Sequence, residues 1–368
     1  SFSDRWIYQD ALASAISSTE WPDIFVINNK ETSVMENQVL AVDPLIVSPN
    51  DFRQRFNPVF SEDLIEVDEV DETLEYLKGI PVWYESLWVY YSRKYFLRPS
   101  ELATWTDFAS EVKSIWEKHT DIVPLAIGNG AWVTRATDII TSLFVIGWWE
   151  SLWKTWANEA KSAFWLYSSY ADADGDNGFG SLYRSFSSNT DIEFFTDGDA
   201  AAMIGYPLDL DAISQIGYQK SFLFATPFPG YAWSEKRTSI NYDYFVINKD
   251  STKWDIAYDL LTYMASNEWQ QSFIDIFPYY LSPELGVFTE MMEKKISPDY
   301  NIVYKNFVDD GAELVSYDIG NLRDYEKQIL PILDESSWQD QDFSKMVSKL
   351  ICGTTKYSTL LNLSSPCR

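Results

Sequence analysis

Three adjacent side chains, Trp83, Tyr84 and Glu85, are of the types needed to hold a hydroxyl-rich ligand. A carboxylate can accept two hydroxyl hydrogen bonds at once, and charge-assisted bonds of this kind are strong. An indole or phenol face can cover apolar C–H groups. Because side chains alternate along a strand, we expect Trp83 and Glu85 on one face and Tyr84 on the other, packed in the core. The alternative is that both rings only pack the point where the strand crosses between sheets.

The elements around these residues alternate between strand and helix. We expect strands at 79–82 and 87–91, then a helix over 104–118 that Thr104 caps, with Asp107 three residues later. Apolar runs predict further strands at 24–27, 122–127, 200–204 and 242–247, and helical spacing covers 5–18, 134–167 and 252–275. This alternation is typical of an α/β sheet protein.

Length and composition favour two domains and exclude several partners. The chain has 368 residues, of which 46% are hydrophobic and 17% aromatic. The net charge of -27 repels phosphate backbones and anionic membranes, so nucleic acid is excluded as a partner. The aromatic excess suggests a surface where flat rings meet a ligand, whereas the charge by itself indicates only solubility.

The two cysteines, Cys352 and Cys367, lie near the C-terminus, where they either form a single disulfide that pins the tail or stay unpaired. The chain contains no CxxC motif, which argues against a zinc site. It has no apolar run of about 20 residues, the length of a membrane helix. It starts at Ser1 without Met, so we expect an exported protein whose signal peptide has been removed.

Enzymatic motifs are scarce. His119 is the only histidine, so Ser-His-Asp and Cys-His arrangements are disfavoured, and no P-loop or G-x-G-x-x-G run occurs. A carboxylate pair that hydrolyses glycosides stays open, because the chain has 55 acidic residues.

An acidic segment at 172–180 partly matches a calcium-binding loop. Asp172, Asp174 and Asp176 occupy the first, third and fifth positions, but Asn177 replaces the usual Gly and Tyr183 replaces the final Glu. The segment therefore predicts either a Ca²⁺ site or a solvated acidic loop, and no other cofactor is expected.

The order of several short motifs resembles extracellular solute-binding proteins of ABC importers, in the sugar-binding group that includes maltose-binding protein. The matching segments, spread over roughly residues 1–290, are 21–25 (WPDIF), 79–91 around Glu85, 104–108 (TWTDF), 195–203 (FTDGDAAAM), 227–230 (PFPG) and 267–271 (NEWQQ). The C-terminal segment agrees only in being helical.

The resemblance implies an α/β fold of the periplasmic-binding-protein type II class, with two lobes and a ligand cleft between them. The N-terminal lobe is expected to contain residues 1–84 and 241–288, and the C-terminal lobe residues 85–240 and 289–368 with a helical tail. Compared with the family, the chain lacks the first strand, helix and strand of the N-terminal lobe.

The resemblance also implies ligand contacts at the ends of several strands, where open α/β sheets bind ligands. For 28–30 the alternative is a plain surface turn rich in Asn. Trp132 follows a Gly-Asn-Gly turn, and such a loop is difficult to explain as core. The predicted ligand-binding residues are Asn28, Asn29, Lys30, Trp83, Glu85, Asn129, Trp132, Tyr206, Asp209, Trp233 and Tyr242.

The implied function is capture of a sugar or oligosaccharide outside the cell by lobe closure, followed by delivery to the membrane subunits of an ABC importer. The expected protein is a monomer and not an enzyme, at the cell surface, with a lipid anchor as its only membrane attachment. The alternatives are a secreted glycoside hydrolase or lyase, and a structural or adhesive surface protein that reuses the fold.

Overall fold

The computed structural model describes most of the chain up to residue 293 and short parts beyond it. The described residues are 8, 11, 12, 14, 15, 22–68, 70–96, 104–127, 133, 135–148, 190–209, 213, 223–230, 237–277, 279–293, 313–318, 325–327 and 330.

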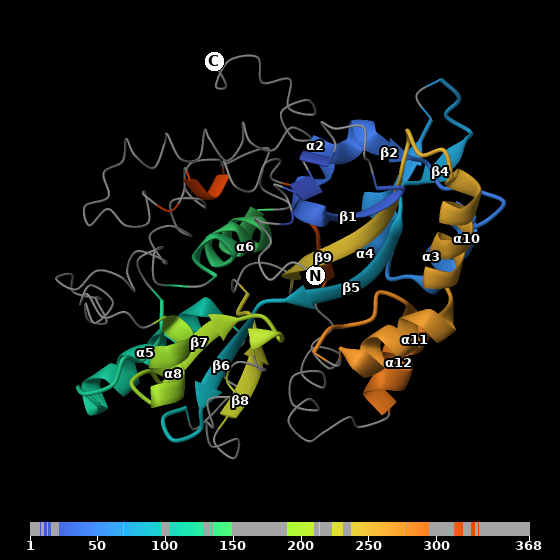
Figure 1. Cartoon of the computed structure of the whole chain (residues 1–368). Helices are drawn as coiled ribbons and strands as arrows, with labels where there is room; N and C mark the ends of the chain where they lie inside the picture. The colour runs from blue at the N-terminus through green and yellow to red at the C-terminus, as the bar shows by residue number, and fades with distance from the viewer. Residues whose placement is uncertain are drawn as a thin grey trace. The chain divides into compact units, whose positions relative to one another are not determined.

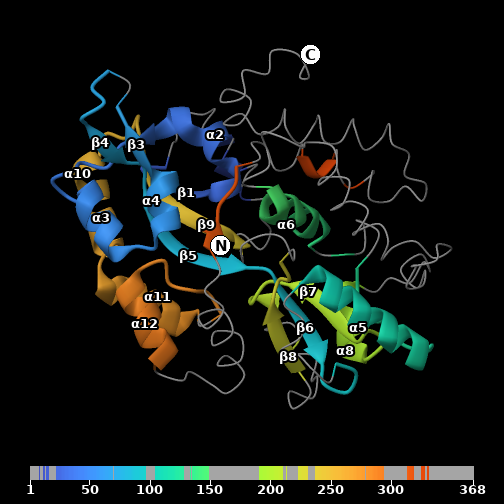
Figure 2. The same ribbon diagram turned by 180° about the vertical axis from the view of Figure 1, so that it is seen from behind.

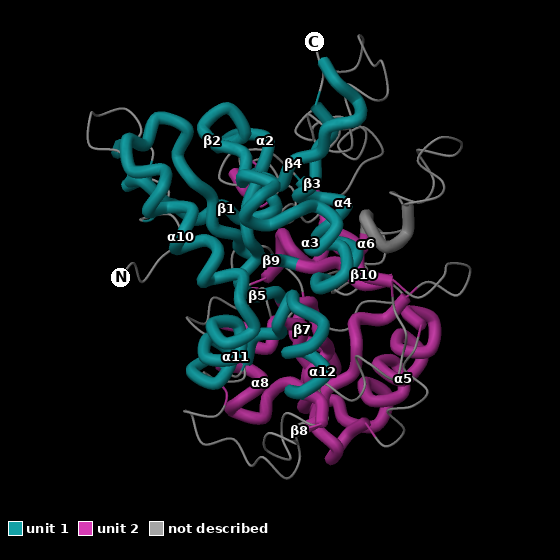
Figure 3. Tube along the Cα trace, turned by 90° about the vertical axis from the view of Figure 1, so that its right-hand side faces the viewer, with its two compact units in different colours: residues 1–84, 241–291, 318–323 teal, residues 85–240, 292–317, 324–368 magenta. Residues whose placement is uncertain are grey.

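The chain divides into two compact units, coloured teal and magenta in Figure 3. Unit 1 contains Ser1–Tyr84, Asn241–Met291 and Asp318–Arg323, and unit 2 contains Glu85–Ile240, Met292–Tyr317 and Asp324–Arg368. Two strands, β5 (Ile80–Ser86) and β9 (Arg237–Asn248), pass from one unit to the other. The sequence placed the first two boundaries at the same residues, 84/85 and 240/241. It placed the third at 288/289 instead of 291/292 and did not return 318–323 to unit 1.

Strand β9 organises the sheet of unit 1. It pairs antiparallel with β1 (Ile24–Asn28) and with β2 (Val39–Leu40), and it also pairs with β5 (Figure 1). Ten of its twelve residues are buried, as expected for a central strand rich in Ile, Val, Tyr and Phe. Phe60 packs edge-on against Tyr242 of β9 and against Tyr84 of β5, with centroid distances of 4.9 and 5.5 Å.

Short helices surround this sheet, and several of them begin with a side-chain cap. Ser48 caps α3 (Pro49–Arg55) and Asn57 caps α4 (Pro58–Leu64), and each helix has Pro at its start, where a missing N–H costs little. A hairpin of β3 (Ile65–Val67) and β4 (Glu75–Leu77) follows α4. Helices α10 (Trp254–Met264) and α11 (Asn267–Ile276) follow one another along one side of the unit in both Figure 1 and Figure 2. Further along the described part of the chain lies α12 (Leu285–Glu293).

Unit 2 contains an antiparallel three-stranded sheet with β6 (Trp88–Ser92) at its centre. β6 pairs with β7 (Ala202–Gly205) on one edge and with β8 (Leu223–Pro227) on the other, and all five of its residues are buried. Helices α5 (Trp105–Lys118) and α8 (Asp191–Asp197) lie on the β7 side of this sheet (Figure 2). Strand β10 (Glu313–Val315) pairs in parallel with residues 237–239 of β9.

The helix predicted over 104–118 is confirmed together with its cap, because the Thr104 hydroxyl accepts the Asp107 N–H. Three strand predictions needed correction. The strand predicted at 200–204 begins only at Ala202, the first residue of β7. Leu87 separates β5 from β6, so the second strand starts at Trp88. Residues 122–127 do not form a strand. They make two isolated parallel bridges, Val123 to Ala200 and Ala126 to Met203. The backbone hydrogen bonds to the segment at 200–203 occur only at these two points and do not form a continuous ladder.

Several predicted features lie outside the described residues. These are the calcium-like segment, both cysteines, most of the helix at 5–18 and the part of the 134–167 region beyond α6 (Ala136–Trp148).

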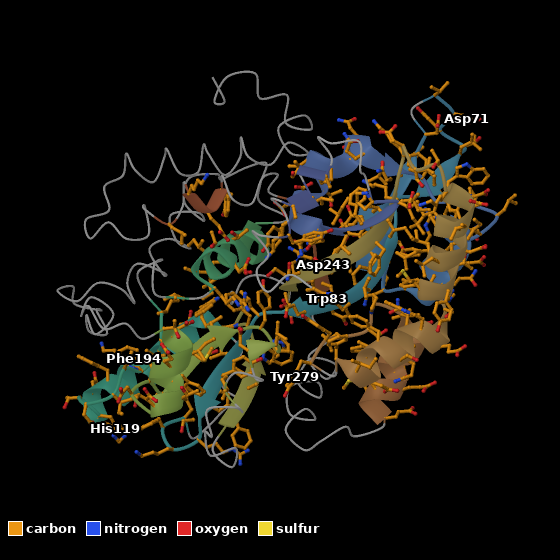
Figure 4. All side chains as sticks on the ribbon, viewed as in Figure 1. Asp71, Trp83, His119, Phe194, Asp243 and Tyr279 are labelled. Carbon is orange, nitrogen blue, oxygen red and sulfur yellow. The ribbon has the colours of Figure 1, made fainter. Side chains whose placement is uncertain are left out.

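The lone histidine, His119, which Figure 4 labels, follows α5. Its ring packs edge-on against Tyr95, with the ring centroids 5.3 Å apart. None of the helices in the described ranges is long and apolar enough to cross a membrane.

Candidate functional site

In unit 1, Trp83 of β5 presents a partly exposed indole that is fixed from one side. Its ring stacks on Tyr280 with centroids 4.2 Å apart and an interplanar angle of 27°. Tyr84 holds the neighbouring segment in place, because its backbone exchanges two 3.0 Å hydrogen bonds with Leu281. Tyr280 therefore covers one face of the indole, and the Trp83 side chain stays partly exposed. Figure 4 labels Trp83 on β5 and Asp243 on β9 of the same unit.

Tyr84, by contrast, is a core residue, as alternation predicted. It is 2% exposed and contacts Phe60 and Phe288. Glu85, the next residue, is the first of unit 2 and is 4% exposed, so burial is high on both faces of the strand here.

Asn28, the last residue of β1, and Asn29, which follows it, join this end of the strand to β9 through side-chain hydrogen bonds. The Asn28 amide nitrogen donates to Asp243 Oδ1 at 2.7 Å, to Asn241 Oδ1 at 2.9 Å and to the Tyr242 carbonyl at 3.1 Å. Asn29 Oδ1 accepts the backbone N–H of Tyr242 at 3.0 Å. These bonds give both amides a positioning role, which does not depend on their predicted contact with a ligand.

Lys30 and Tyr242 are also buried in unit 1. Lys30 is 1% exposed, in the short 3₁₀ helix η1 (Asn29–Glu31) that precedes α2 (Thr32–Met35) and the 3₁₀ helix η2 (Glu36–Gln38). The Tyr242 hydroxyl donates to Asp63 Oδ2 at 2.8 Å. Burial raises the pKa of the neighbouring Tyr244, against the hydrogen bond that it makes with Thr32.

In unit 2, Arg135 and Asp209 form an ion pair at two points. Arg135 Nη2 donates to Asp209 Oδ1 at 2.9 Å and Nε donates to Oδ2 at 3.3 Å. The same carboxylate accepts the backbone N–H of Tyr206 at 2.8 Å, and the Arg135 guanidinium lies 5.1 Å from the centroid of the Tyr206 ring. Asp209 thus closes the turn after β7 and fixes the guanidinium just before α6.

Two more carboxylates act on this pair. Burial opposes the charge of Arg135, but Asp209, Glu85 and Asp138 outweigh it and raise the pKa of the guanidinium. Burial, followed by the charges of Asp138 and other neighbours including Glu85, raises the pKa of Tyr206. We call these five residues, Glu85, Arg135, Asp138, Tyr206 and Asp209, the Arg135 cluster.

The structure thus brings three predicted residues together in unit 2, namely Glu85, Tyr206 and Asp209, and groups Asn28, Asn29 and Tyr242 in unit 1. The predicted residues Asn129, Trp132 and Trp233 and the predicted metal ligands Asp172, Asp174 and Asp176 lie outside the described residues. Among the described side chains there is no group of three or more that could hold a metal ion.

Sequence reasoning missed Arg135, Asp138, Asp63 and Tyr280. Arg135 lies three residues after Trp132 and directly before an apolar helix, so its position next to a flagged loop was the available signal. Tyr280 belongs to a Pro-Tyr-Tyr run after α11, but nothing in its local pattern points to Trp83.

Comparison with known proteins identifies the family. A model of the family described as bacterial extracellular solute-binding protein matches residues 7–271, which is most of the chain. The chain belongs to this family. Its members are binding proteins that are secreted or periplasmic, so this solute-binding protein works outside the cytoplasm. No curated protein sequence gives a significant match.

Solved structures of this class share the fold at low sequence identity. An ABC substrate-binding protein from Listeria monocytogenes in complex with cycloalternan has a TM-score of 0.71 and 12% identity, over 97% of this chain and 89% of its own. The sugar-binding protein MalE from Xanthomonas citri has a TM-score of 0.71 and 14% identity, over 98% and 90%. The maltose-maltodextrin-binding protein of Alicyclobacillus acidocaldarius has a TM-score of 0.63 and 16% identity, over 95% and 89%. The two-lobed periplasmic-binding-protein fold predicted for this chain is therefore confirmed.

Proposed function

We propose that this solute-binding protein captures a sugar or oligosaccharide and delivers it to the membrane subunits of an ABC importer. The observation that carries the proposal is the Trp83–Tyr280 stack in a member of this family. The stack holds a partly exposed indole in a fixed orientation. Structures that share the fold are described as complexes with cycloalternan, maltose and maltotetraose, which supports a carbohydrate as the ligand class.

The chemistry of the described residues suits such a ligand. A pyranose ring has an apolar C–H face that packs on an indole, and its hydroxyls both donate and accept hydrogen bonds. Trp83 supplies the aromatic face and Glu85 a carboxylate acceptor, whereas the carboxylate of Asp209 is committed to Arg135 and to the Tyr206 N–H. The other predicted contacts stay part of the proposal. They are Asn28, Asn29, Lys30, Asn129, Trp132, Tyr206, Trp233 and Tyr242.

Calorimetric titration with maltose, maltotetraose, xylotetraose and tagatose tests the proposal. We expect at least one of these sugars to bind, and we expect Trp83→Ala to weaken it about tenfold or more, since a lost aromatic contact costs roughly 1.5 to 3 kcal/mol. Trp254→Ala is the matched control, because Trp254 is a 55% exposed tryptophan on α10 of the same unit. An unchanged Kd in Trp83→Ala would remove Trp83 from the site.

The finer parts of the proposal have separate tests. Binding without catalysis predicts no new reducing ends after incubation with these oligosaccharides. Capture by lobe closure predicts a smaller radius of gyration in small-angle scattering when sugar is bound. A monomer is expected in light scattering.

Calcium and the lipid anchor also belong to the proposal. Calcium binding at Asp172, Asp174 and Asp176 predicts a higher Tm in Ca²⁺, and an unchanged Tm would argue against that site. Attachment at the cell surface through a lipid anchor predicts that the protein from its native source partitions into detergent.

A further inference from the structure

In the ion pair between Arg135 and Asp209, Arg135 is the more exposed partner. Its side chain is 27% exposed, whereas that of Asp209 is 7% exposed. Two-point pairing with Asp209 and the contact with the Tyr206 ring hold the guanidinium in one plane. Such a planar group loses little further freedom when it forms additional hydrogen bonds.

The guanidinium has more donors than these contacts use. A guanidinium carries five N–H groups, and Asp209 takes one from Nε and one from Nη2. Across the described parts of the chain, Nη1 makes no hydrogen bond to the protein. A group that is fixed, partly exposed and still able to donate is what a hydroxyl-rich ligand requires.

The charges around Arg135 point to the kind of ligand. Asp209 pairs with the guanidinium at two points, and the negative charges of Glu85 and Asp138 also act on it. An anionic ligand would meet this net negative charge at short range, and like charges there are unfavourable. A neutral hydroxyl can bind to positive and negative groups alike. Its oxygen accepts a hydrogen bond from a guanidinium, and its O–H donates one to a carboxylate.

We propose that Arg135 is a ligand-binding residue that donates through Nη1 to a sugar hydroxyl, and that the Arg135 cluster selects uncharged sugars over uronates. This inference rests on the proposed carbohydrate function. Asp209 acts through Arg135 as a positioning residue.

The first test compares Arg135→Lys with the native protein in calorimetric titrations of the four neutral sugars named above. Lysine keeps the charge but loses the planar fork, so we expect the Kd of the bound sugar to rise about 10- to 100-fold, the range for a hydrogen bond to a charged group. Arg53→Lys is the matched control. Arg53 makes an equivalent two-point pair with Glu75 on the surface of unit 1, at 2.7 and 2.8 Å, and we expect no change in Kd.

The second test separates positioning from stability. Asp209→Asn should weaken sugar binding about tenfold, and the double variant Arg135→Lys/Asp209→Asn should bind no worse than Arg135→Lys alone, because both changes remove the same contact. Circular dichroism and Tm are measured for each variant. A Kd that follows Tm, or losses that add in the double variant, overturns the positioning role.

The third test uses trigalacturonate as an anionic probe. The native protein should not bind it at concentrations that saturate the neutral sugar, and tighter binding of trigalacturonate overturns the selectivity. If a neutral sugar binds and Arg135→Lys binds it with native affinity, the role of Arg135 is refuted while the carbohydrate function stands. If no sugar binds to the native protein, the carbohydrate function fails and this inference fails with it.

Discussion

Replacing Asn28 by Ala separates two roles that this residue could have. Its side chain donates to Asn241, Tyr242 and Asp243, and its oxygen accepts the backbone N–H of Lys30. The amide has two hydrogens for three acceptors, so only two of the three donated bonds reach full strength. One of the acceptors is a carboxylate, which makes the stronger kind of bond.

The size of the effect follows from these bonds. A bond to a charged group is worth about 2 kcal/mol and a neutral bond about 1 kcal/mol, so Asn28→Ala should lower the free energy of unfolding by about 3 kcal/mol. Most of this loss arises because the partners on β9 stay buried without the amide. Asn57→Ala is the matched control, since Asn57 caps α4 through one bond of 3.3 Å, and it should cost about 1 kcal/mol.

The assay is urea unfolding monitored by tryptophan fluorescence, together with calorimetric titration of the bound sugar. We expect Asn28→Ala to shift the midpoint of unfolding well beyond the shift in Asn57→Ala. A variant of native stability that has lost its affinity for sugar would refute the reasoning. Asn28 would then be a ligand contact whose bonds to β9 add little.

Two other predictions concern unit 1. Gly79→Ala should destabilise the fold by roughly 1 to 3 kcal/mol or abolish expression. A Cβ at this position would clash with the backbone oxygen of Phe245 and lie 2.8 Å from Tyr244 Cδ2. A variant with the native Tm would contradict this close approach. Glu66→Gln should lower Tm more at pH 7 than at pH 3. Burial opposes the Glu66 charge, but Lys78 outweighs it and holds the pKa of Glu66 below its ordinary value of about 4.3, so the stabilisation is present above that pH and lost as the pH falls through the lowered pKa. An equal loss of Tm at both pH values would exclude Lys78 as the cause.

Local patterns were enough to predict much of the fold. The Thr104 cap, the apolar start of β5 and the buried run of β9 each depend on residues within a few positions, and all three occur as expected. The segment at 122–127 has the same apolar character but forms only bridges. Whether an apolar run becomes a strand depends on the length of contact with its partner, which lies far away in the sequence.

The same limit explains the missed site residues. Arg135 and Asp209 are 74 residues apart, and neither stands in a motif that indicates the other. Tyr280 reaches Trp83 only through the backbone pairing of Tyr84 with Leu281. The sequence could indicate which residues had suitable chemistry, but their partners depended on long-range pairing.

Strand β9 has a consequence for how the chain acquires its structure during synthesis. The side chain of Asn28 donates a hydrogen bond to Asn241, 213 residues later in the sequence. Strand β1 therefore cannot pair with β9 until most of the chain has been synthesised. The three strands of the unit 2 sheet are complete at Pro227, before β9 begins at Arg237. Because local and early-completed pairings form first, the sheet of unit 2 is expected to fold before that of unit 1, although unit 1 holds the N-terminus. A nascent chain of which residues up to 236 have left the ribosome should then protect β6 from proteolysis while leaving β1 open to cleavage.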